Sequence, residues 1–116
     1  KLRHGAEADK MYQKVFDIDP DNYKAILSYG YHLFFNKRFT EALEQFYTAR
    51  KLDKRQNNWS ICVGIARTLQ ELNDMDQAEY YYKLGVGENL KSGNTQFYEI
   101  GHFYYGLFLK KAGRLK

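Results

Sequence analysis

The amino-acid sequence predicts an all-α protein made of antiparallel helix pairs. Hydrophobic residues recur at intervals of three and four positions, as they do along one face of an α-helix. Proline occurs once and glycine nine times in 116 residues, so few helix-breaking residues divide the chain. One spacing of small and bulky residues also returns along the chain at intervals of 34 to 40 residues. A repeat of this length is typical of helix pairs that stack side by side and share a core.

The composition narrows the class of protein. No apolar run approaches the roughly 18 to 20 residues that a membrane-spanning helix needs, so we expect none. The net charge is +4, but acidic and basic residues alternate along the chain, as on a solvated mixed surface. The single cysteine, Cys62, has no partner for an intrachain disulfide and favours a reducing, cytoplasmic location. Because the chain begins without an initiator Met, we expect a segment of a longer protein, so its targeting is not assessable.

The first predicted helix covers about residues 5–19. It ends before Pro20, because the residue that precedes a proline disfavours helical backbone angles. Asp21 is then placed to cap a second helix over about residues 22–36. A tight turn leads to a third helix over about residues 39–53, which folds back on the second. Gly30 and Ala42 are small enough to let these two backbones approach closely, and Phe46 can fill the space beside them.

Three more helices are predicted over about residues 57–72, 75–91 and 95–112. The last two predicted helices are separated by Ser92, Gly93 and Asn94. Gly113 ends the last helix. The chain therefore starts with the second helix of one pair and stops after the first helix of another.

Small residues set the register of the repeats. Ala8, Ala42 and Ala78 are equivalent in the second helices, and Gly30, Ala66 and Gly106 are equivalent in the first helices. Bulky residues flank the second set in the same way, as Ile26/Tyr29/Leu33, Cys62/Ile65/Leu69 and His102/Tyr105/Leu109. This register makes 1–116 a single segment with a partial repeat 1–20, a repeat 23–56, a longer repeat 59–94 and a partial repeat 95–116.

This pattern resembles the tetratricopeptide repeat (TPR), whose spacing is W-x2-L-G-x2-Y…A-x3-F…P over 34 residues. The central repeat matches it with conservative replacements as Ile26-x2-Tyr29-Gly30-x2-Leu33…Ala42-x3-Phe46, and Ala8-x3-Tyr12…Pro20 matches its second half. The chain departs from the pattern in its longer spacings and in Lys54 and Leu90, which replace the closing proline. The resemblance implies a right-handed TPR-like solenoid of about six helices, with partial repeats at both ends, from a larger TPR protein.

In TPR arrays the first helices line a concave groove, and the resemblance places a set of apolar and aromatic side chains there. Arg67 falls near the middle of this groove, where it can pair with an acidic group of a partner. The residues assigned to the partner-binding groove are Lys24, Leu27, Tyr31, Val63, Arg67, Gln70, Phe103 and Tyr104. The alternative is that further repeats, a capping helix or the superhelical turn cover these side chains.

No group of residues in the sequence argues for catalysis, a metal ion or a cofactor. The three histidines are His4, His32 and His102, and no two of them have the spacing of four residues that suits a helical metal pair. His32 and His102 fall beside or on packing positions, and Cys62 is interpreted as a small buried hydrophobic residue. We therefore expect a protein without enzymatic activity.

The predicted function is a non-catalytic protein–protein interaction scaffold that binds a peptide or partner helix in its concave groove. Its partners are then a protein or peptide ligand, or neighbouring subunits of a complex. One alternative is an RNA-binding TPR module, because exposed aromatic rings can stack on bases. Another is a regulatory, peptide-sensing domain of a larger protein. Leu109, Tyr105 and Phe108 are expected to lose cover at the C-terminal end, which predicts self-association of the segment through that end.

Overall fold

The computed structural model describes the backbone over residues 2–54, 58–92 and 95–113, and the side chains over residues 6–54, 58–87 and 103–113. These ranges form six α-helices and contain no strand. The helices are α1 (Leu2–Ile18), α2 (Tyr23–Phe35), α3 (Phe39–Leu52), α4 (Trp59–Glu71), α5 (Met75–Ser92) and α6 (Thr95–Lys111). The predicted all-α class and order of helices are confirmed, and each helix end lies within a few residues of its predicted position.

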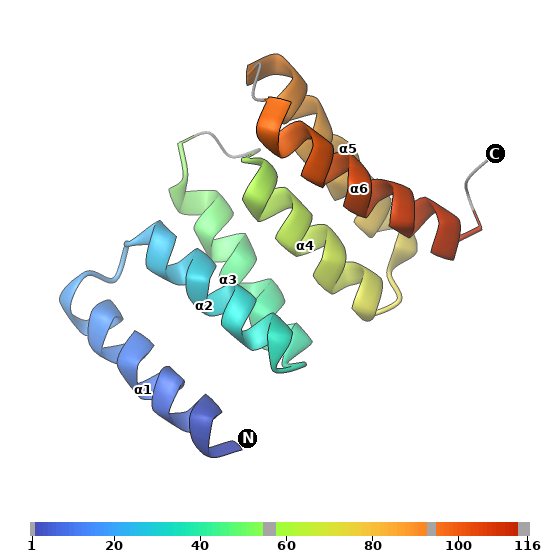
Figure 1. Ribbon diagram of the computed structural model, residues 1–116. Coiled ribbons are helices and arrows are strands. Elements are labelled where there is room, and N and C mark those ends of the chain that lie inside the picture. The colour runs from blue at the N-terminus through green and yellow to red at the C-terminus, as the bar shows by residue number, and fades with distance from the viewer. Residues whose placement is uncertain (1, 55–57, 93–94, 114–116) are drawn as a thin grey trace.

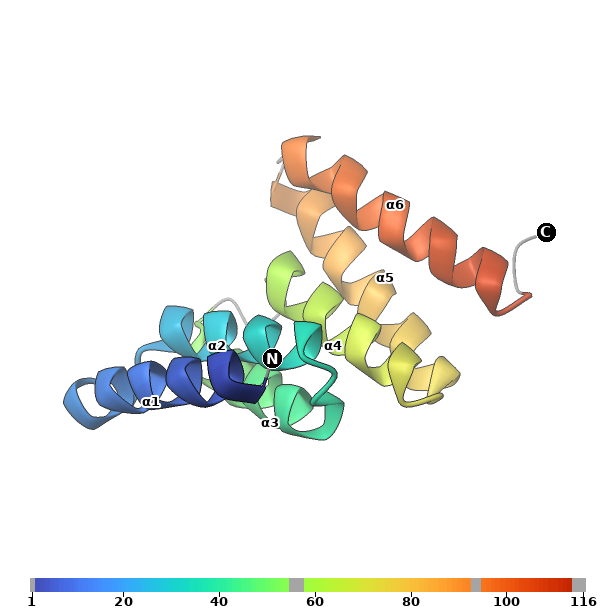
Figure 2. The same cartoon turned by 60° about the horizontal axis from the view of Figure 1, so that its bottom comes forward.

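The helices stack as successive antiparallel pairs. α2 pairs with α3 and α4 pairs with α5, while α1 packs on α2 and α6 packs on α5 (Figure 1). α4 lies at the centre, where it contacts α2, α3, α5 and α6. The array measures 46 × 30 × 21 Å, and Figure 2 shows that α6 lies well outside the plane shared by α1 and α2. This arrangement is an all-α helical-repeat solenoid.

The turns that follow α2 and α4 have the same backbone structure. In each turn one residue adopts left-handed backbone angles, Lys37 at φ 62° and Asn73 at φ 65°. The next residue closes the turn, because Arg38 N donates to Leu33 O and Asp74 N donates to Leu69 O, both at 2.9 Å. In each turn the bond joins the first and last of six residues, which is the Schellman motif. This motif satisfies carbonyl groups at a helix end.

The left-handed residues follow the repeat register that the small residues predicted. Lys37 and Asn73 lie 36 residues apart, as do Gly30 and Ala66. Gly113 adopts φ 69° after α6, and it lies 40 residues beyond Asn73. Each of the three first-type helices, α2, α4 and α6, is therefore followed by a residue with left-handed backbone angles.

The cap of α2 differs from the prediction. Asn22, rather than Asp21, precedes the first helical residue, and its Oδ1 accepts a hydrogen bond of 3.1 Å from Ala25 N. An Asn side chain caps a helix about as well as an Asp side chain. Helical backbone angles begin at Tyr23, so Asn22 is the residue in the capping position.

The ring of Phe46 fills the space between the first-type helices α2 and α4. A Cβ atom added at Gly30 would lie 2.8 Å from Phe46 Cε1, and one added at Gly64 would lie 2.9 Å from the same carbon. Phe46 and Ala42 are fully buried. The predicted close approach at Gly30 is thus confirmed. The ring of Phe46 leaves no room for a side chain at Gly64 either.

The core is densest around α4, and it extends to α6. Buried side chains of α4 include Cys62, which is fully covered as predicted. On α6, Phe108 is 0% exposed and its ring centroid lies 5.1 Å from that of Tyr82. The prediction that Phe108 loses cover at the C-terminal end is therefore wrong, because α5 covers this face of α6. Tyr105 and Leu109 are partly buried against the core, whereas Phe103 and Leu107 are exposed.

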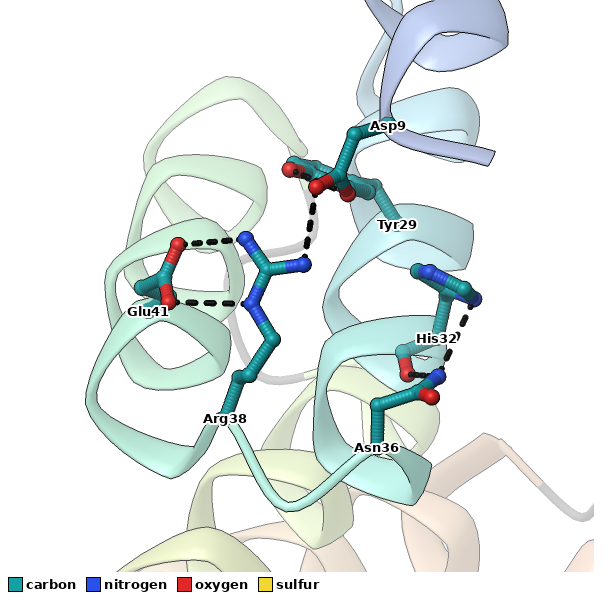
Figure 3. Close-up of polar contacts among 6 residues, drawn as sticks. All are labelled: Asp9, Tyr29, His32, Asn36, Arg38 and Glu41. Atoms are coloured by element: carbon teal, nitrogen blue, oxygen red, sulfur yellow. Dashed lines mark hydrogen bonds and ion pairs between the residues drawn. The ribbon is translucent and has the colours of Figure 1, made fainter. Parts of the chain in front are cut away.

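A polar network holds α1 against the α2–α3 hairpin (Figure 3). Arg38 Nη1 donates to Asp9 Oδ2 at 2.8 Å, and its Nε and Nη2 form a two-point contact with Glu41. Tyr29 completes the network by donating to Asp9 Oδ1 at 3.0 Å. Beside it, His32 packs against Tyr29 with ring centroids 6.2 Å apart, so this histidine has a packing position as predicted.

Candidate binding surface

Arg67 lies on α4 among aromatic rings from the two neighbouring first-type helices. Its Cζ atom lies 4.3 Å from the ring centroid of Tyr104 on α6 and 4.8 Å from that of Phe34 on α2. The ring of Phe35, at the end of α2, is 5.8 Å away. We refer to Phe34, Phe35, Arg67, Phe103 and Tyr104 as the Arg67 surface.

Two members of this surface are largely open to solvent. Phe35 is 67% exposed and Phe103 is 61% exposed. Phe103 is joined to the cluster by an edge contact with Tyr104, whose ring centroid is 5.6 Å away. An exposed cluster of large rings is uncommon on a protein that has no binding partner.

Tyr31 and Val63, which the sequence places in the groove, belong to the packing between helices. Tyr31 donates a hydrogen bond of 2.6 Å to Ser60 O, and its ring meets that of Phe46 edge-on at 4.8 Å. Val63 is only 2% exposed. Tyr31 therefore takes part in helix packing as well as lying on the face assigned to the groove, because α4 crosses α2 closely enough for the hydroxyl to reach it.

The other assigned groove residues lie around the Arg67 surface. Lys24 is exposed and Leu27 is half-buried against the core. Gln70 Oε1 accepts a hydrogen bond of 3.0 Å from the Tyr82 hydroxyl, which fixes its amide. The structure therefore brings Arg67, Phe103 and Tyr104 together, places Lys24 and Leu27 farther along α2, and gives Gln70 an internal partner.

The neighbouring phenols are neutral near pH 7, and burial makes them still harder to ionise. Desolvation raises the pKa of Tyr31 to about 12, although its hydrogen bond to Ser60 and the charge of Arg67 act in the opposite direction. Desolvation likewise raises the pKa of Tyr82, against the opposing effect of Arg67. Neither phenol can supply a negative charge to Arg67 near neutral pH.

Phe35 is the residue that the groove assignment missed. The pair Phe34–Phe35 ends α2, and adjacent residues on a helix point in directions about 100° apart. Phe34 is therefore buried while Phe35 extends outward, and Arg67 reaches both rings. Two consecutive phenylalanines at a helix end are a signal for such a surface, since one helix face cannot bury both.

The described part of the chain contains no cluster of three or more His, Cys, Asp or Glu residues that could hold a metal ion. Within the same part, none of the helices is both long enough and apolar enough to span a membrane. The side chains of His4 and His102 lie outside the described residues.

The fold and this surface define a helical-repeat protein with an exposed aromatic cluster. No known family model matches the chain. The chain is similar to DnaJ homolog subfamily C member 3 of Bos taurus, with 26% identity over 85 residues. The match covers 73% of this chain but only 16% of the relative's length. This weak similarity and the six-helix architecture are both compatible with a TPR-like fold.

Proposed function

We propose that the chain is a non-catalytic, TPR-like interaction module that holds a peptide or a partner helix against the Arg67 surface. The observation that carries this proposal is the exposure of Phe35 and Phe103 on the two sides of Arg67. Aromatic residues and arginine are the residue types that contribute most binding energy at protein interfaces. Here they belong to three different helices, so the packing of the solenoid fixes their relative positions.

The surface suits a narrow partner segment better than a flat protein face. Its side chains come from the first-type helices α2, α4 and α6, which lie side by side across the array (Figure 1). A segment that crosses these helices would meet Phe35 and Phe103 in turn. The weak similarity to a DnaJ homologue is compatible with a helical-repeat protein that binds other proteins.

A peptide selection tests the proposal. Random twelve-residue peptides displayed on phage are selected on the immobilised chain, and the enriched peptides are synthesised with a fluorescein label. We expect micromolar binding by fluorescence anisotropy and at least a roughly tenfold loss in a Phe35→Ser/Phe103→Ser variant. The matched control is Met11→Ser/Ile18→Ser, which removes two exposed apolar side chains from α1.

The selection also separates the proposal from its competitors. Failure to enrich any peptide, or equal losses in the two double variants, would contradict it. Labelled oligouridine provides the RNA comparison, because phosphate contacts make affinity fall steeply with salt concentration. Tight, salt-sensitive binding of oligouridine that depends on Phe35 and Phe103 would favour the RNA-binding alternative instead.

A further inference from the structure

Arg67 carries a positive charge that no acidic residue balances within the described ranges. The ion pairs found there join Arg38 to Asp9 and Glu41, and Lys83 to Glu79. Arg67 instead lies close to three aromatic rings, those of Phe34, Phe35 and Tyr104. These rings attract the cation through their negative faces, but they do not accept the in-plane hydrogen bonds of a guanidinium.

Within the described residues the N–H groups of Arg67 form no hydrogen bond, and none of its nitrogens is fully buried. In the described part of the chain, His32 Nε2 is the buried side-chain nitrogen or oxygen without a hydrogen-bond partner, and Arg67 has no such atom. The nearby polar groups also have partners, since Tyr31 donates to Ser60 O and Tyr82 donates to Gln70. The N–H groups of Arg67 are therefore able to donate hydrogen bonds to an acceptor on a binding partner.

The rings make this position more selective than an ordinary surface arginine. Contacts with α2 and α6 restrict the side chain, so less conformational entropy is lost when it binds. The surrounding apolar groups also lower the local dielectric constant, which strengthens a charge-assisted hydrogen bond. A single guanidinium matches the two oxygens of one carboxylate.

Resting on the proposed function, we propose that Arg67 recognises a glutamate or aspartate side chain in the partner segment. The residues that flank this acid are apolar, and they pack on Phe35 and Phe103. Selectivity for the partner thus combines one carboxylate at the centre with hydrophobic side chains on both sides of it.

A double-mutant cycle on the selected peptides tests this assignment. Each Glu or Asp in an enriched peptide is replaced by Gln or Asn, and binding is measured to the wild-type chain and to Arg67→Gln. We expect one acid whose replacement weakens binding to the wild-type chain at least about tenfold but has little further effect in Arg67→Gln. Arg67→Lys should restore part of the affinity, because it keeps the charge without the two-point geometry.

Arg50→Gln is the matched control, because Arg50 also lies over a ring, that of Tyr81 at 5.4 Å, but on the second-type helix α3. Its coupling to the same acid should be absent. Enriched peptides without acids, or acids that are not coupled to Arg67, would overturn this assignment while the peptide-binding function stands. Tighter binding after phosphoserine replaces the acid would overturn the choice of a carboxylate. If no peptide is enriched, both proposals fail.

Discussion

The ring of Phe46 lies so close to Gly30 that a Cβ atom at residue 30 would stand 2.8 Å from ring carbon Cε1. The ring is fully buried and also contacts Gly64, so it has little room to move. We expect Gly30→Ala to lower the free energy of unfolding by about 1–3 kcal/mol, even though alanine favours helix formation. Urea denaturation followed by circular dichroism measures this change.

Gly106→Ala is the matched control for that substitution. Gly106 occupies the equivalent repeat position on α6, but a Cβ there would meet no atom within 4 Å. The change should raise the free energy of unfolding by up to about 1 kcal/mol, through helix propensity alone. Similar effects at the two glycines would contradict the close packing of Phe46 on α2.

Replacement of Lys37 by glycine should stabilise the chain. Lys37 adopts φ 62°, which a side chain with a Cβ atom disfavours. Glycine removes this strain, although it also gives the unfolded chain more conformational freedom. We expect the free energy of unfolding to rise by about 0.5–1 kcal/mol. Asn73→Gly should gain less, because asparagine tolerates these angles better. A loss of stability in Lys37→Gly, measured by thermal unfolding, would argue against the left-handed turn.

The attachment of α1 should weaken in acid. Burial raises the pKa of Asp9, but the hydrogen bonds from Arg38 and Tyr29 outweigh it and hold the pKa below its ordinary value of 3.8. The ionised carboxylate therefore stabilises the fold fully at pH values well above 3.8, and this contribution is lost as the pH falls through the lower, folded-state pKa.

Asp9→Asn isolates this effect. The difference in unfolding free energy between wild type and Asp9→Asn should shrink between about pH 5 and pH 2. Asp17→Asn, on the same helix, serves as the control for a general charge effect. A difference that stays constant over this range would show that the Asp9–Arg38 contact does not contribute to stability.

The two faces of α6 should respond differently to truncation. Phe108 is 0% exposed and packs on Tyr82, so Phe108→Ala should lower the free energy of unfolding by about 3–5 kcal/mol. Phe103 is 61% exposed, and Phe103→Ala should change it by less than about 0.5 kcal/mol. Equal losses in urea denaturation would mean that α6 is rotated relative to the structure described.

Self-association through α6 remains a prediction, but the residues that would carry it have changed. Among the described side chains of α6, residues 103–111, the exposed large hydrophobic ones are Phe103 and Leu107, at 61% and 49%, whereas Phe108 is covered. We expect the average mass from light scattering to rise with concentration, and to rise less in Phe103→Ser/Leu107→Ser. A monodisperse monomer at high micromolar concentration would contradict this expectation.

The helices were predictable because packing imposes a simple pattern on the sequence. Gly30 and Phe46 show this, since a close helix pair needs a small residue opposite a large one. The candidate site was less predictable, because exposure depends on how neighbouring helices cross. Tyr31 lies on the predicted face of α2, yet α4 approaches closely enough for its hydroxyl to bind Ser60 O. The way α4 crosses α2, which partly buries Tyr31, is not encoded in the spacing of any single helix.

The central position of α4 has a consequence for how the chain comes apart. Repeat proteins are stabilised mainly by contacts between neighbouring units, so their halves are often able to unfold separately. Here eight of the thirteen residues of α4 are buried, and α2, α3, α5 and α6 all share in covering them. If α2 and α3 unfold, or if α5 and α6 unfold, buried residues of α4 become exposed to water. The helix pairs repeat in space, but we expect them to unfold together in a single thermal transition.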